Sequence, residues 1–159
     1  MPARVYLDWN ATAPLRPEAR EAMVAALDVA GNPSSVHAEG RAARALVERA
    51  RAQLAEALGA GGADIVFTSG ATEAAALALA GRDLAGSGIE HDAVKAWADQ
   101  SLAVDEDGRV TVPDPERATL QLANSETGVV QALPEGLAVS DLTQGFGKLP
   151  FAFDWSGIE

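Results

Sequence analysis

The sequence predicts an α/β fold in which short parallel strands alternate with helices. Brief β-branched or apolar runs, typical of buried strands, alternate along the chain with longer stretches whose apolar residues recur at helical spacing. The chain has 159 residues, which is the usual size of one domain. Strands that alternate with helices pair in parallel, because each helix carries the chain back along the sheet.

Four stretches have the spacing of helices. Pro17 suits a first helical turn, and apolar residues follow it at helical spacing until Gly31 ends the segment. A long amphipathic helix is expected over residues 38–58, with charged residues opposite its apolar face. A third helix is expected over residues 71–80, and a shorter one around residues 93–98.

Other stretches read as strands. Residues 65–68, Ile-Val-Phe-Thr, are predicted to form a buried strand because they are β-branched and aromatic and lie between turn residues. Shorter strands are expected at residues 110–112, 120–123 and 137–140, and a short extended piece is expected within residues 84–92.

The composition limits the classes of partner. Twelve basic against 23 acidic residues give a net charge of −11, which repels phosphate backbones and excludes nucleic acid except through a local patch. Cysteine is absent, which excludes disulfides, cysteine-ligated metals and a thiol nucleophile; no metal ligands are assigned. No apolar run reaches the roughly 18 residues of a membrane span, and no signal peptide is visible. We therefore expect a cytoplasmic chain with no membrane partner.

The junction Ser69-Gly70-Ala71-Thr72 is a candidate anion site. It precedes the third helix, and a helix N-terminus offers free N–H donors and a partial positive charge. Thr72 adds a hydroxyl, so phosphate is a suitable ligand. The alternative is an ordinary strand-to-helix turn in which Ser or Thr caps the helix.

Three further residues are candidates by type and position. His91 follows an expected extended piece, and histidine is the residue type suited to proton transfer at neutral pH, but it also suits a partly buried structural role. His37 lies on a turn before a helix, where a capping segment is the stronger interpretation. Asp141 ends an apolar strand, where ligands bind in open α/β sheets, although a capping or turn aspartate is equally compatible.

Taken in order, a series of motifs resembles those of cysteine desulfurases, members of the class V aminotransferase family of pyridoxal-phosphate (PLP) enzymes. The motifs are residues 6–12, 31–37, 65–73, 90–94, 124–131 and 141–150. The resemblance implies the PLP fold type I large domain, a three-layer, mainly parallel sheet flanked by helices, incomplete in this chain. Residues 1–15 would then form an N-terminal extended segment, and residues 16–159 the N-terminal part of the large domain.

The resemblance also implies roles for the candidate residues. Ala71 and Thr72 would bind the cofactor phosphate, and Asp141 would pair with the pyridine nitrogen and keep it protonated. His91 would stack on the ring and act as the catalytic residue that shuttles protons. We expect Thr72 and Asp141 to face one pocket at the carboxyl ends of neighbouring strands, with His91 at its mouth.

Other positions match the family pattern less completely. Gln144 would hydrogen-bond the phenolic oxygen of the ring, and Ser125 takes the place of a second cofactor-contacting asparagine in many relatives. Lys148 matches a different family position and Lys95 lies just past the His91 motif, so the resemblance makes neither the Schiff-base lysine. The family pattern places that lysine, the catalytic cysteine and the substrate-binding arginine after residue 159. Residues 131–141 are shorter than the corresponding helix and strand of most relatives.

The resemblance implies a PLP-dependent enzyme that converts L-cysteine to alanine and persulfide sulfur, represented by its N-terminal portion. A non-catalytic binding or scaffold relative is one alternative, and a related PLP lyase or aminotransferase acting on another amino acid is a second. Expected partners are a second copy of the chain in a homodimer, the missing C-terminal portion and a sulfur-acceptor protein. We expect this chain alone to bind PLP weakly and to release no sulfide.

Overall fold

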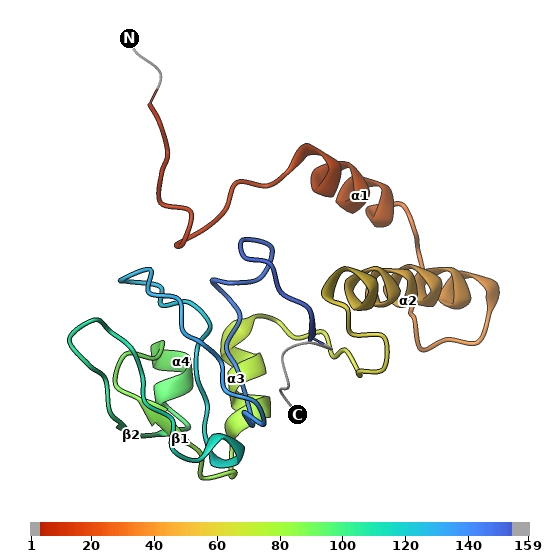
Figure 1. Cartoon of the computed structure of the whole chain (residues 1–159). Helices are drawn as coiled ribbons and strands as arrows, with labels where there is room; N and C mark the ends of the chain where they lie inside the picture. Colours follow the sequence, from red (N-terminus) through yellow and green to blue (C-terminus); the bar gives the residue numbers. More distant parts are fainter. Residues whose placement is uncertain (1–3, 154–159) are drawn as a thin grey trace. The chain divides into compact units, whose positions relative to one another are not determined.

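The chain forms two compact units, Met1–Ala57 and Leu58–Glu159, in a computed structural model that describes residues 4–153 (Figure 1). The two compact units meet after residue 57, whereas the sequence predicted a boundary after residue 15, between an extended segment and the large domain. That residues 16–159 belong to one cofactor-binding domain stays a prediction. Among the described helices, none has the length and apolar character needed to cross a membrane.

The first unit contains two helices, α1 (Pro17–Leu27) and α2 (Ala38–Leu58), which confirm the two longest helices expected from the sequence. Pro17 occupies the first turn of α1, where its missing N–H costs no intrahelical bond. No residue of α1 is buried, although apolar side chains such as Met23 and Leu27 lie on it.

The loop before α2 is packed tightly against the first turn of that helix. The Gly40 N–H lies 3.3 Å from His37 Nδ1, so His37 caps α2, and the predicted capping segment is confirmed. A Cβ atom added at Gly40 would lie 2.4 Å from the Ser35 carbonyl oxygen and 2.7 Å from that of Asn32. Glycine is therefore required at position 40 by close backbone approach.

The second unit is built on parallel hydrogen-bonded segments. Strands β1 (Ala85–Ser87) and β2 (Asp99–Leu102) pair in parallel. Residues 118–122, called here the central segment, follow β1 through a parallel bridge between Ala85 and Ala118. A second parallel bridge joins Thr119 to Val139. The lateral order is thus β2, β1, the central segment and residues 139–141, which confirms the predicted parallel α/β arrangement.

Two apolar clusters stabilise this unit. Helices α3 (Ala71–Leu79) and α4 (Asp92–Lys95) lie side by side (Figure 1) and share the first cluster. Its buried members are Leu79, Leu84, Val94 and Ala138. The second cluster is built from the central segment and its neighbours, and its buried members are Ala118, Leu120 and Leu137.

Several predicted strands are wrong or shorter than expected. Residues 65–68 belong to no strand or bridge of the described chain, and Val66 is 73% exposed rather than buried. The apolar run stays open because no described segment pairs with it. The strands expected at residues 110–112, 120–123 and 137–140 take part only in isolated bridges or single hydrogen bonds. Strand β2 was not predicted, because Asp-Gln-Ser-Leu lacks the apolar pattern of a buried strand.

We predict that Gly40→Ala lowers the free energy of unfolding by about 1–3 kcal/mol, because the new methyl group meets backbone oxygens that cannot move independently. Gly61→Ala is the matched control, since a Cβ atom at Gly61 meets nothing within 4 Å. Urea unfolding of both variants measures the difference. Equal stability of the two variants would contradict the close packing of this loop.

Candidate functional site

The N-terminus of α3 leaves its first amide groups available. Its N-cap, Gly70, makes no side-chain cap hydrogen bond, so the alternative of a Ser or Thr cap is not what the structure shows. Ser69 instead donates from both its N–H and its hydroxyl to Glu73 Oε2, each at 2.6 Å. These two bonds hold the pKa of Glu73 below its usual value, and the bond from the Ser69 hydroxyl has the larger effect. The N–H groups of Ala71 and Thr72 lie in the first turn and therefore have no acceptor within the helix.

His91 is exposed and forms the N-cap of α4. Its Nδ1 accepts a hydrogen bond from the Ala93 N–H at 3.1 Å. Because Nδ1 is the acceptor, the neutral ring carries its proton on Nε2. Because the ring is exposed, His91 is not the partly buried histidine that the sequence also allowed. Its structural role is to cap α4, which also fixes its tautomer.

Asp141 ends the last of the parallel segments and is half-buried. Its carbonyl oxygen accepts from the Leu122 N–H at 2.9 Å, and its Oδ1 accepts from the Thr143 N–H at 2.8 Å. Asp141 therefore has the turn geometry that the sequence allowed as an alternative, and the turn fixes its carboxylate at the carboxyl end of the segment. Gln144, also half-buried, follows in the same turn and accepts a hydrogen bond from the Lys148 ammonium.

Ser125 lies in a tight turn after the central segment. The turn is organised by buried Asn124, whose Oδ1 accepts from the N–H groups of Glu126 and Thr127 at 2.9 and 2.8 Å. The Ser125 hydroxyl donates to Glu126 Oε1 at 3.4 Å. Ser125 is therefore on a well-defined turn that begins where the central segment ends.

Glu90 is a buried acid beside these residues to which the sequence reasoning gave no role. It is 3% exposed, and its Oε1 accepts from the Gln121 N–H at 3.1 Å. Burial, and secondarily the charge of Asp141, raises the pKa of Glu90 to about 7, while the Gln121 N–H and the nearby Ser87 hydroxyl oppose the rise. Glu90 Oε2 and Ser87 Oγ are both buried and form no hydrogen bond within the described residues.

Two signals in the sequence could have pointed to this buried group. Gln121 is a polar residue inside an otherwise apolar expected strand, and Glu90 is an acid directly after an extended piece. In the structure the Gln121 side chain donates to the Ile89 carbonyl oxygen at 3.0 Å, and Asn124 Nδ2 donates to the same oxygen at 2.8 Å. Polar residues in apolar strands are buried only when such bonds satisfy them.

The start of α3, His91 and Asp141 lie toward one edge of the parallel segments. Leu79 at the end of α3 packs against Leu84, which precedes β1, and against Ala138, which precedes residues 139–141. The helix therefore runs back along the sheet, and its N-terminus points toward the carboxyl ends (Figure 1). That Thr72, His91 and Asp141 face one pocket stays a prediction, and the segment before Thr72 is not a strand.

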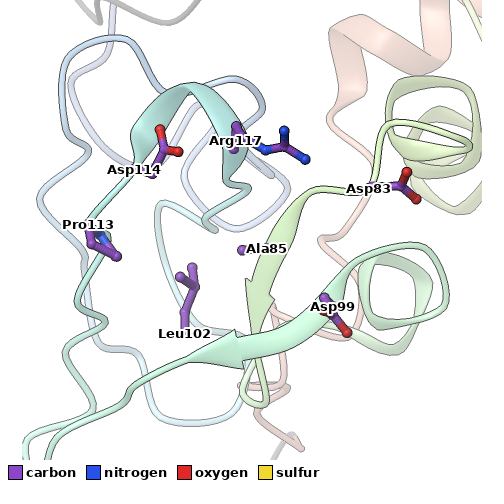
Figure 2. A pocket seen from close by; sticks show the side chains of 7 residues that line it. All are labelled: Asp83, Ala85, Asp99, Leu102, Pro113, Asp114 and Arg117. Carbon is purple, nitrogen blue, oxygen red and sulfur yellow. The ribbon is translucent and has the colours of Figure 1, made fainter.

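A cavity of about 220 Å³ lies elsewhere, near the amino ends of β1 and of the central segment (Figure 2). It is bounded on one side by residues next to and within the 3-10 helix η1 (Pro115–Arg117). Its lining residues are Asp83, Ala85, Asp99, Leu102, Pro113, Asp114 and Arg117. None of the sequence-predicted site residues lines it, so the expected pocket shared by Thr72, His91 and Asp141 is not this cavity.

Comparisons with known proteins show the family. The model of the "Aminotransferase class-V" family matches residues 5–139, so the chain belongs to this family. A cysteine desulfurase of Frankia sp. (strain EuIK1) is 36% identical over 200 residues, covering 98% of this chain and 48% of that protein. A cysteine desulfurase of Cereibacter sphaeroides is 38% identical, with 98% and 50% covered. Human selenocysteine lyase is 31% identical, with 83% and 40% covered.

Solved structures give the same result for the fold. The NifS-like protein from Rickettsia africae ESF-5 superposes with a TM-score of 0.84 at 31% identity, covering 97% of this chain and 52% of that one. The chain thus spans about half the length of the relatives that it matches, and it has the PLP fold type I architecture in part. The Frankia alignment extends over 200 residues although this chain has 159, so the relative carries additional residues within the matched stretch.

The residues present fit the non-covalent contacts of PLP. First-turn amides and the exposed Thr72 hydroxyl are donors suited to a phosphate. Gly70 adds open space, since a Cβ atom there would meet nothing within 4 Å. The half-buried carboxylate of Asp141 is suited to a protonated ring nitrogen, and the exposed His91 ring is available for stacking.

We predict that the buried Glu90 makes stability depend on pH. Folding raises the pKa of Glu90 from 4.5 to about 7, so the folded state binds more protons than the unfolded state between these values. Its contribution to stability is therefore complete below pH 4.5 and is lost as the pH rises through 7, by up to about 3 kcal/mol.

Glu90→Gln removes this titration. Urea unfolding at about pH 5 and pH 8 should show that the variant gains stability relative to the unsubstituted chain at the higher pH. An identical stability difference at both pH values would contradict the buried, proton-binding state of Glu90.

Proposed function

We propose that the protein to which these residues belong is a PLP-dependent cysteine desulfurase, which converts L-cysteine to alanine and delivers the sulfur as a persulfide. The observation that supports the proposal is that α3 begins without a side-chain cap, that Thr143 fixes the Asp141 carboxylate, and that His91 is exposed at the start of α4. Membership of the class-V family and the cysteine desulfurases among its relatives support it.

The N-terminus of α3 would hold the cofactor phosphate. Glu73 already engages both donors of Ser69, so the contacts fall to the amides of Ala71 and Thr72 and to the Thr72 hydroxyl. The partial positive charge of the helix end adds an attraction of the right sign. The phosphate would thereby orient the rest of the cofactor toward the carboxyl ends of the parallel segments.

Bound PLP would supply an electron sink for the amino-acid substrate. Asp141 would bind the ring nitrogen and hold a proton on it, while His91 would stack on the ring and move a proton to or from the substrate. The hydrogen bond that Ala93 donates to His91 Nδ1 leaves Nε2 as the atom that carries the proton. Gln144 and Ser125 would contact the phenolic side of the ring.

The lysine that binds PLP covalently would come from outside these 159 residues. Lys95 forms an ion pair with Asp92 at 2.7 Å, and Lys148 is bonded to Gln144. The 159 residues also contain no cysteine to receive sulfur. We therefore propose that these residues belong to a longer protein, called here the natural-length protein, and that activity needs that protein. It would act in the cytoplasm as a homodimer with a sulfur-acceptor protein.

The similarity to selenocysteine lyase supports a second candidate. In this reading the same PLP contacts serve a lyase that removes selenium or another β-substituent from a different amino acid. The two candidates share every residue assigned above, so they are separated by substrate rather than by cofactor binding.

We predict that Asp141→Ala in the natural-length protein lowers PLP affinity roughly 10- to 100-fold, because a charge-assisted hydrogen bond to the ring nitrogen is lost. Sulfide release from L-cysteine should fall at least as much. Asp114→Ala is the matched control, since Asp114 is exposed and lies at the other edge, beside the cavity.

PLP absorbance and sulfide assays would measure both effects. PLP binding without sulfide or selenide release would exclude the release of sulfur from cysteine and of selenium from selenocysteine, and would leave a PLP enzyme acting on another amino acid. Absence of PLP binding by the unsubstituted natural-length protein would contradict the cofactor assignment and favour a scaffold relative.

We further predict that borohydride reduction of PLP-treated protein leaves Lys95 and Lys148 unmodified. Lys95 is paired with Asp92 and Lys148 donates to Gln144, and neither lysine matches the position of the family's Schiff-base lysine. Peptide mass mapping locates the pyridoxyl group. A stoichiometric adduct on either lysine, with turnover by this chain alone, would overturn the proposed division of the site.

A further inference from the structure

Glu90 is a buried acid for which the proposed function has no task. Its side chain is 3% exposed, so an ionised carboxylate there would be costly without partners. One oxygen accepts from the Gln121 N–H at 3.1 Å. The other oxygen is buried and makes no hydrogen bond within the described chain.

The hydrogen bonds of residues 89 and 90 fix the backbone directly before His91. Three hydrogen bonds tie residues 89–90 to the central segment and the turn after it: Gln121 N–H to Glu90 Oε1, and the side-chain amides of Gln121 and Asn124 to the Ile89 carbonyl oxygen. His91 is the next residue, and its own Nδ1 is fixed by Ala93. Loss of the Glu90 acceptor would leave the Gln121 N–H buried without a partner and would loosen the chain just before His91.

The central segment, which bonds Glu90 through Gln121, also bonds Asp141. The Leu122 N–H, one residue after Gln121, donates to the Asp141 carbonyl oxygen at 2.9 Å. The carboxylate of Asp141 is close enough to raise the pKa of Glu90. When two carboxyl groups interact, the more buried one takes the proton and the other keeps the negative charge. Besides Asp141, the groups that act on Glu90 are the Gln121 N–H and the Ser87 hydroxyl.

We propose that Glu90 is a positioning residue of the cofactor site, which fixes the backbone before His91 by accepting the buried Gln121 N–H. Its protonated carboxyl offers an acceptor to Gln121 without placing a second negative charge beside the ring-binding carboxylate. The inference rests on the proposed function for the identity of the ligand, whereas the hydrogen bonds that carry it do not.

The experiment compares Glu90→Gln with Glu90→Leu in the natural-length protein, using PLP labelled with ¹⁵N in the ring. Glu90→Gln keeps a neutral side chain with an acceptor oxygen, so PLP affinity and the ring-nitrogen chemical shift should stay as in the unsubstituted protein. Glu90→Leu has similar volume but no acceptor. It should lower PLP affinity roughly tenfold, and it should speed amide exchange at Gln121 and His91 by a similar factor.

Glu135→Gln serves as the control, because Glu135 is exposed and its substitution should change none of these readouts. A folded Glu90→Leu variant with unchanged PLP affinity, ring-nitrogen shift and amide exchange would overturn the proposal. If Glu90→Leu does not fold, the carboxyl ¹³C signal of Glu90 in the unsubstituted protein decides. A protonation change near pH 7 would support the neutral acid, and full ionisation at pH 5 would refute it.

The outcomes also separate this inference from the proposed function. Failure of the unsubstituted protein to bind PLP would refute the cofactor assignment, while faster exchange at Gln121 and His91 in Glu90→Leu would still show that Glu90 fixes this backbone. Normal PLP affinity, ring-nitrogen shift and amide exchange in all folded variants would leave the proposed function intact and refute the positioning role.

Discussion

The hydrogen bonds that the central segment makes on both of its sides hold the candidate site together. On one side, Thr119 N–H donates to the Ala85 carbonyl oxygen at 2.8 Å. On the other side, Leu122 N–H donates to the carbonyl oxygen of Asp141 at 2.9 Å. The carboxyl ends of β1 and of residues 139–141 are therefore set against one common segment. His91 and Asp141 acquire their relative positions from it, although 50 positions of sequence separate them.

Charge is arranged around this segment in a consistent way. The helix end at Ala71 and Thr72 favours an anion, and the carboxylate of Asp141 favours a cation. PLP carries both groups, a phosphate and a protonated ring nitrogen, in one small molecule. The raised pKa of Glu90 fits the same pattern, because burial next to Asp141 favours one negative charge rather than two.

The sequence predicts best those elements that depend on local interactions. Helix α2 begins and ends at the expected residues because its apolar stripe, its capping loop and Gly59 are all local signals. The buried strand predicted for residues 65–68 is wrong because a buried strand needs a partner, and no described segment supplies one. Strand β2 was missed for the opposite reason: its polar residues are ordered by pairing with β1 and not by their own preference.

The residues of the candidate site also differ in whether local or distant contacts reveal them. The candidate anion site at the start of α3 and the candidate Asp141 follow from residue type and position, whereas the buried Glu90 is recognised only through its contact with Gln121, 31 residues further along the chain. The most direct measurement is a crystal structure of the natural-length protein with PLP. The proposed site predicts the phosphate on the amides of Ala71 and Thr72 and the ring nitrogen within about 3 Å of the Asp141 carboxylate. A cofactor bound away from Asp141, or a phosphate held elsewhere, would contradict it.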